Sequence, residues 1–175
     1  MLKPEEVRDV LLPDAYIKEH GVSYFSLADE YYYDENGVYH YERMFDKPME
    51  DGGTPFSGVV FETFEDSDQI AYYTEYQDGY QFGNHAAFYE NGALRCYIRM
   101  DEKEYYVYEW YENGVLEKMT EFHSYRGQTH RSRESEWYEN GVLKKTTEWQ
   151  RKGCQYLSRS KEYNETGRLI RKSCG

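Results

Sequence analysis

The sequence has few of the aliphatic residues that usually build a protein core. Leu, Ile, Val and Phe together account for only 30 of its 175 residues. With a net charge of −12, so small an apolar fraction is typical of disordered chains. The chain has instead 21 Tyr and 3 Trp, and their rings supply the missing apolar area. Because Tyr also carries a polar hydroxyl, this composition predicts an ordered sheet with limited cover on its faces.

Cysteine and long hydrophobic runs are scarce as well. The three cysteines, Cys96, Cys154 and Cys174, do not have the spacing of a metal site. No apolar run has the length of a signal peptide, and none approaches the roughly 18 residues that a membrane span requires. These absences predict a cytoplasmic protein with reduced thiols.

Positive charge is rare in the first two thirds of the chain. Residues 1–122 contain 27 acidic and 9 basic side chains, whereas residues 123–175 contain 6 and 12. An acidic chain disfavours binding to nucleic acid or anionic membranes and favours a basic partner. The densest acidic groups are the candidate partner contacts, with ordinary turn and surface carboxylates as the alternative. They are Glu62, Glu65, Asp66 and Asp68 on one expected hairpin, and Asp101, Glu102 and Glu104 on another.

A repeated segment organises the rest of the sequence, and three copies of it have the full form aromatic-Tyr-Glu-Asn-Gly-x-Leu. Counted by the glycine place, the copies lie at Gly37, Asp68, Gly92, Gly114, Gly141 and Gly167, with Asp68 replacing glycine in a degenerate copy. The spacing of roughly 25 residues is enough for two strands and two turns. Around these turns the sequence alternates with the period of a strand, as in Leu94, Cys96, Ile98 and Met100, which we expect on one face.

Asn-Gly between alternating runs is a strong hairpin signal, and two turn types are possible. A two-residue loop would place Tyr138 opposite Leu143. A three-residue Glu-Asn-Gly loop would pair Trp137 with Leu143, Tyr138 with Val142, and Glu136 with Lys144. The second register joins large apolar residues and opposes unlike charges, so we favour it.

These features predict an all-β protein, an elongated antiparallel meander of about six tandem β-hairpins. Residues 1–25 lie outside the repeat and are expected to form an N-terminal cap, with a short helix before Pro13. Residues 26–175 form the repeat domain, interrupted by an irregular loop at residues 46–55.

The repeats resemble those of the YwqK-type antitoxin family, which are variants of the MORN repeat. The resemblance rests on the aromatic hairpin motif and on a glycine pair in the inter-hairpin turn, matched here by Gly79 and Gly83. It is good from about residue 79 to 172, weak from 26 to 78 and absent before that. Gly127 and Gly153 keep the first glycine of the pair, but Arg131 and Leu157 stand where the second is expected. The resemblance implies an antitoxin or immunity protein that holds a toxin inactive by binding it.

The sequence contains no motif of known catalytic chemistry. It has no phosphate loop, nucleophile elbow or zinc-binding His-Glu-x-x-His segment. His123 and His130 flank an expected turn, and we interpret them as surface histidines rather than a metal pair. The prediction is a non-enzyme without cofactor or metal.

Three functions are therefore open. The favoured one is an immunity protein or antitoxin that occludes the active cleft of a cognate, basic toxin. The first alternative is a MORN-like scaffold that self-assembles, as a homo-oligomer, through exposed sheet edges. The second is an aromatic repeat that binds carbohydrate or choline, which cation–π contacts to tryptophan would serve.

Overall fold

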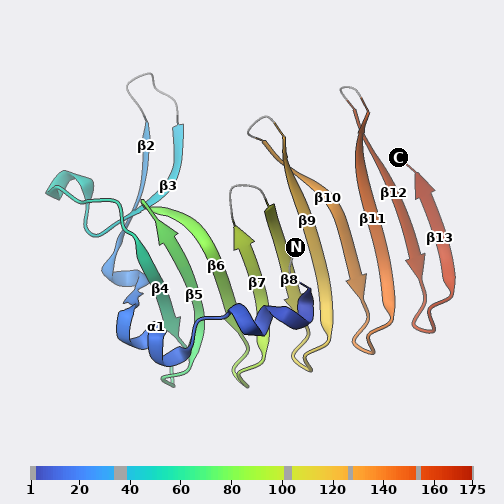
Figure 1. Cartoon of the computed structure of the whole chain (residues 1–175), viewed down its shortest axis with the longest axis horizontal. Helices are drawn as coiled ribbons and strands as arrows, with labels where there is room; N and C mark the ends of the chain where they lie inside the picture. The colour runs from blue at the N-terminus through green and yellow to red at the C-terminus, as the bar shows by residue number, and fades with distance from the viewer. Residues whose placement is uncertain (1–2, 34–38, 101–103, 126–127, 153–154, 175) are drawn as a thin grey trace. The chain divides into compact units, whose positions relative to one another are not determined.

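A computed structural model describes residues 3–33, 39–100, 104–125, 128–152 and 155–174 of the chain. It confirms the predicted all-β meander: eleven mostly antiparallel strands form one long sheet that is not closed into a barrel (Figure 1). The order of strands in this sheet is β1-β4-β5-β6-β7-β8-β9-β10-β11-β12-β13. The first hairpin, β2–β3, forms a separate two-stranded sheet.

The helical elements are short and lie near the N-terminus or in the predicted irregular loop. They are η1 (Pro4–Val10), α1 (Asp14–His20), η2 (Tyr24–Ser26) and η3 (Met49–Asp51), of which only α1 is an α-helix. The strands are β1 (Val22–Ser23), β2 (Ala28–Tyr33), β3 (Tyr39–Phe45), β4 (Gly58–Thr63), β5 (Ile70–Gln77), β6 (Tyr80–Phe88), β7 (Leu94–Met100), β8 (Glu104–Trp110), β9 (Leu116–Tyr125), β10 (Gln128–Trp137), β11 (Leu143–Lys152), β12 (Gln155–Tyr163) and β13 (Leu169–Cys174).

The chain divides into two compact units. Unit 1 comprises residues 1–10 and 87–175, and unit 2 comprises residues 11–86. The N-terminal segment is thus shared, since η1 belongs to unit 1 and α1 to unit 2. The expected helix before Pro13 is present as η1, which has 3-10 geometry.

In unit 1, η1 lies against one face of the sheet and its Val7 is fully buried. Tyr97 and Tyr108, directly opposite each other on β7 and β8, are fully buried as well, and their rings stack at 6.5 Å. Tyrosine therefore builds this core, as the composition predicts.

In unit 2, α1 packs on β4 and contributes Ile17 to the core. The hydroxyl of the buried Tyr73 accepts a hydrogen bond of 3.1 Å from the main-chain NH of Leu12. A β-carbon at Gly21 would lie 2.5 Å from the Ile17 carbonyl, so only glycine allows the chain to leave α1 this closely. It then enters β1, which pairs in parallel with β4.

The hairpin turns adopt the favoured three-residue form. Trp137 lies opposite Leu143, and the NH of Tyr138 donates to the Val142 carbonyl at 2.9 Å, which confirms two of the predicted pairs. Gly141 adopts a φ of 80°, in the left-handed region that favours glycine. The third pair was wrong.

Glu136 lies opposite Lys145, because Lys144 forms a bulge after the Trp137–Leu143 pair. Lys144 still approaches Glu136, and its ammonium lies 3.6 Å from the carboxylate. The strand alternation expected in β7 was also wrong at Leu94. Leu94 lines the same cavity as Trp110, on the Tyr97 and Tyr108 face, and not on the face of Cys96.

The degenerate copy at Asp68 also differs from expectation. Asp68 is not in the left-handed region, and the turn instead contains four residues between Phe64 and Gln69. The NH of Phe64 donates to the Gln69 carbonyl at 3.0 Å, one residue further on than in the glycine turns. The extra residue removes the need for a positive φ. The turn with Gly37 lies outside the described residues.

Successive hairpins of unit 1 are joined by a repeated hydrogen bond. The hydroxyls of Tyr89, Tyr111 and Tyr138 donate to the main-chain carbonyls of Trp110, Trp137 and Tyr163, at 2.7, 2.9 and 2.9 Å. The last described hairpin, β12–β13, has Asn164 in place of this tyrosine. The second aromatic residue of the repeat therefore connects neighbouring units.

Candidate protein-binding surface

The net negative charge of the chain lies in unit 2. Its residues 11–86 contain 16 acidic and 3 basic side chains, a net charge of −13. Unit 1 contains 17 acidic and 18 basic side chains, a net charge of +1. A negative field extends from unit 2 over about a Debye length, roughly 8 Å at physiological ionic strength.

In unit 1 many carboxylates form ion pairs with Lys or Arg side chains of the same sheet. Glu134 is the best example, since Lys118 and Arg131 both lie 3.1 Å from its carboxylate. A row of directly opposed residues near the turns also alternates in charge across six strands. It consists of Glu109, Lys118, Glu136, Lys145, Glu162 and Arg171. Such opposed pairs stabilise the sheet and leave little net charge for a partner.

Glu62, the first candidate contact, holds the local structure of unit 2. Its Oε1 accepts hydrogen bonds from the hydroxyl of Ser23 at 2.6 Å and from the NH of Tyr24 at 2.8 Å. It therefore fixes η2 beside the end of β4. Glu62 also lies opposite Tyr72 and, second to burial, raises the pKa of that phenol.

The remaining candidates of this hairpin lie in the turn between β4 and β5. Glu65, Asp66 and Asp68 are all exposed. The carboxylate of Asp68 is 97% exposed and lies 3.2 Å from the ammonium of Lys18 on α1. An ion pair this exposed contributes little to stability, so these three carboxylates remain accessible to a partner.

An exposed aromatic residue lies in η2, next to the end of β4 that leads into this acidic turn, and sequence reasoning did not identify it. Phe25, in the η2 turn that Glu62 holds, is 85% exposed. Its ring packs edge-on against Tyr24 at 5.9 Å, and the Tyr24 hydroxyl donates to Asp29 at 2.9 Å. The placement follows from the pairing of β1 with β4, which lies far away in the sequence, so no local signal could have indicated it.

The second group of candidate contacts cannot be placed in this way. Asp101 and Glu102 lie outside the described residues. Glu104 begins β8 and is opposite His123 of β9. Of the two predicted acidic groups, only the one formed by Glu62, Glu65, Asp66 and Asp68 can therefore be described as a surface.

Few side chains in the described part of the chain are suited to catalysis or metal binding. His123 and His130 lie directly opposite each other on β9 and β10. Within the described ranges, no group of three or more His, Cys, Asp or Glu could hold a metal ion. Cys96 and Cys174 are free thiols, and burial raises the pKa of Cys96 to about 11. No described helix is both long and apolar enough to span a membrane.

Comparisons with protein-family models and with curated proteins found no match for this chain.

Proposed function

We propose that this protein is an antitoxin or immunity protein that binds a basic protein toxin and blocks its active cleft. The binding surface is formed by the acidic turn of unit 2 and by Phe25 of η2. The protein acts without catalysis, cofactor or metal. The resemblance of its hairpins to the YwqK-type repeats supports the class, and the charge of unit 2 supports the chemistry of the partner.

The observation that carries this proposal is an exposed aromatic ring in η2, which Glu62 fixes at the end of β4, and the exposed carboxylates of the turn that follows β4. Aromatic residues are enriched at protein interfaces, and a few buried anchors supply most of the binding energy. Phe25 provides such an anchor, and Glu65, Asp66 and Asp68 provide an acidic rim. Toxins that attack nucleic acid need basic clefts for phosphate, and this surface complements such a cleft.

Self-assembly is the alternative function that a specific observation favours. Among the described strands, β13 pairs only with β12 and lies at an edge of the long sheet. All six of its residues are exposed, with Ile170 62% exposed. An edge with unpaired main-chain groups is a template for pairing with another chain. A size in solution that increases with concentration would support this function.

The first experiment is affinity capture of partners from the native host at low salt, followed by expression of the captured protein alone. We expect one stoichiometric basic protein that is released as salt rises and that stops growth unless this chain is co-expressed. If only further copies of this chain are captured, from cells in which the toxin is expressed, the result would support self-assembly instead.

Substitutions then test the surface. Phe25→Ala and the double change Glu65→Lys, Asp66→Lys are expected to weaken binding by about tenfold or more and to abolish protection. Glu139→Lys, in an exposed turn of unit 1, is the matched control and is expected to protect like the wild type. Equal protection by all variants would contradict the proposed surface.

A further inference from the structure

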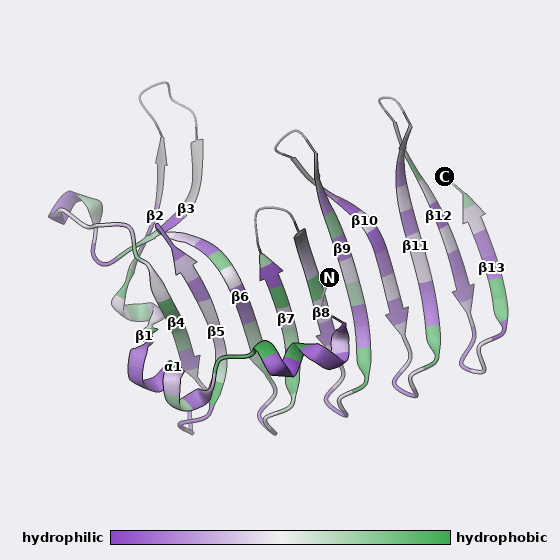
Figure 2. Ribbon diagram, in the orientation of Figure 1, coloured by the Kyte–Doolittle hydropathy of each residue, from purple (hydrophilic) through white to green (hydrophobic). Residues whose placement is uncertain are grey.

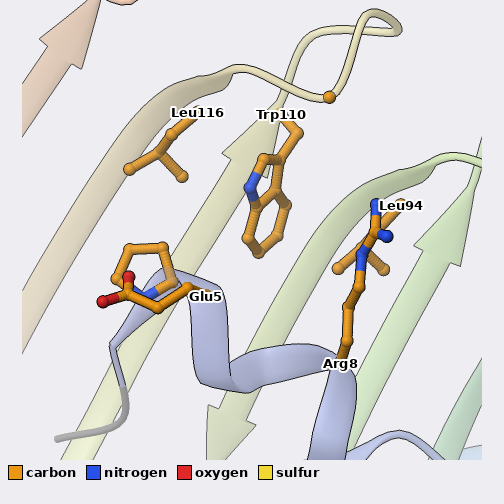
Figure 3. A pocket seen from close by; sticks show the side chains of 7 residues that line it. Glu5, Arg8, Leu94, Trp110 and Leu116 are labelled. Carbon is orange, nitrogen blue, oxygen red and sulfur yellow. The ribbon is translucent and has the colours of Figure 1, made fainter.

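One face of unit 1 carries a row of large apolar residues near the hairpin turns, and η1 covers only its first part. Pro4, Glu5 and Arg8 of η1 face Trp110 and its neighbours Leu94 and Leu116 across a cavity of about 450 Å³ (Figure 3). Under this cover Leu94 is 7% and Trp110 8% exposed.

The same face continues across β10 to β13. Directly opposed and alternate residues of strands share a face. The register connects Tyr108 to Met119, Ser135, Thr146, Lys161 and Lys172 in turn. Trp137 and Tyr163, two residues beyond Ser135 and Lys161, therefore lie on the face of Trp110, together with their partners Leu143 and Leu169.

No described segment covers this continuation. In Figure 1, η1 crosses in front of β7 and β8, and β10 to β13 have no described segment in front of them. The hydropathy colours show apolar ends at β9, β11 and β13 on the turn side (Figure 2). Leu169 is 39% exposed, and Trp137, Leu143 and Tyr163 are half-buried. Trp137–Leu143 and Tyr163–Leu169 repeat the Trp110–Leu116 pair that η1 covers.

Uncompensated positive charge borders the uncovered part. Lys161 and Lys172 are exposed and directly opposite each other, an arrangement that repels within the sheet. Arg159 is exposed on the same face, and its opposed carboxylate, Glu148, pairs with Arg133 at 3.2 Å. Among the described residues, no carboxylate pairs with Lys161 or Lys172.

We propose that this surface, formed by Trp137, Leu143, Tyr163, Leu169, Lys161 and Lys172, binds an acidic, apolar segment of a partner protein. Apolar side chains of the segment lie on the two aromatic–leucine pairs, and its carboxylates relieve the repulsion between Lys161 and Lys172. The site is distinct from the acidic surface of unit 2 and does not rest on the antitoxin function.

The chemistry of the occupant is inferred from η1, which covers the equivalent aromatic–leucine pair, Trp110–Leu116, within the chain. Its sequence Pro-Glu-Glu-Val-Arg-Asp-Val combines apolar residues with three carboxylates and one arginine. A nucleic acid would match the charge of Lys161 and Lys172, but its backbone would not bury the leucine pairs. A protein segment matches both properties.

The test uses the full chain and a fluorescent peptide with the sequence of residues 1–12, MLKPEEVRDVLL, in a fluorescence anisotropy titration. Lys172→Gln and Arg171→Gln form a matched pair. Each substitution removes one positive charge, but the two residues are adjacent in β13 and therefore lie on opposite faces of the sheet. We expect Lys172→Gln to weaken binding about threefold or more, Lys161→Gln with Lys172→Gln about tenfold, and Arg171→Gln less than about twofold.

The thermal stability of the lysine variants is measured in parallel. Removing opposed like charges is expected to leave it unchanged or raise it, so lost binding would not reflect unfolding. A peptide with Gln and Asn for its carboxylates is expected to bind more weakly. The proposal is overturned if the double lysine variant binds the peptide as tightly as the wild type. That result would mean that the peptide displaces η1 and binds in its place. The absence of saturable peptide binding would overturn it equally. So would competition by an oligonucleotide together with unchanged binding in Leu143→Ala, which would indicate a nucleic acid. Dimers that are lost in Leu169→Ala would indicate that a second copy of the chain covers this surface.

Discussion

The hydroxyl of Tyr111 donates a hydrogen bond of 2.9 Å to the main-chain carbonyl of Trp137, 26 residues further along the chain. Tyr89 and Tyr138 make the same bond to the carbonyl of the following hairpin. Neighbouring turns are joined in addition by the side-chain amides of Asn113 and Asn140, which donate to the carbonyls of Glu139 and Glu165 at 3.3 Å. The repeated motif therefore specifies both its own turn and the contact with the next unit.

Removing this hydroxyl should destabilise unit 1. Tyr111→Phe and Tyr138→Phe each remove a part-buried hydrogen bond and are expected to cost about 1 kcal/mol in urea unfolding. Tyr163, whose hydroxyl has no hydrogen-bond partner in the described structure, is the control. Tyr163→Phe is expected to change stability by less than about 0.5 kcal/mol. Equal losses in all three variants would contradict a linking role.

The glycine of the hairpin turn should be replaceable by asparagine more readily than by alanine. Gly114 has a φ of 82°, and a β-carbon there would meet nothing within 4 Å. The cost of substitution is therefore backbone strain alone, about 1–2 kcal/mol for Gly114→Ala. Asn tolerates the left-handed region better, so Gly114→Asn should cost less. Chemical denaturation of both variants tests the order, and a smaller loss for alanine would contradict it.

Reversing one charge in the cross-strand row should destabilise the sheet in a salt-dependent way. Lys118 lies opposite Glu109 and Glu136, and its ammonium is 3.1 Å from Glu134. Lys118→Glu places like charges opposite each other and should cost about 1–2 kcal/mol, less at high salt. Unfolding at about 0.05 M and 1 M salt measures the difference. A loss that is independent of salt would indicate a packing effect instead.

The stability of the protein should decrease above about pH 9 partly through Cys96. Burial raises the pKa of this thiol from 9.0 to about 11, because the thiolate is poorly solvated in the folded chain. The stabilisation is fully present below the unfolded pKa and is lost as the pH rises to about 11, on the order of 1–2 kcal/mol.

Tyr72, Tyr105 and Tyr108, whose pKa values burial also raises, act in the same direction. The contribution of Cys96 is therefore read from the difference between the wild type and Cys96→Ala, in denaturation curves from pH 7 to 11. Parallel curves would show that the thiol does not contribute.

The sequence by itself determined the repeat, the turn type and the all-β meander. These depend on local signals: Asn-Gly allows the left-handed turn, alternation sets the strands, and Trp137 with Leu143 selects the register. The bulge at Lys144 was missed, because the sequence alternates with the same period whether or not one residue is inserted into the pairing.

Only the tertiary structure decided which side chains remain available. Glu62 is held by Ser23 and Tyr24 through a parallel pairing between segments about 38 residues apart, and Phe25 is exposed for the same reason. The division of η1 and α1 between two units is equally non-local. Such contacts depend on which surfaces meet after the chain folds, and a linear pattern of residue types does not contain that information.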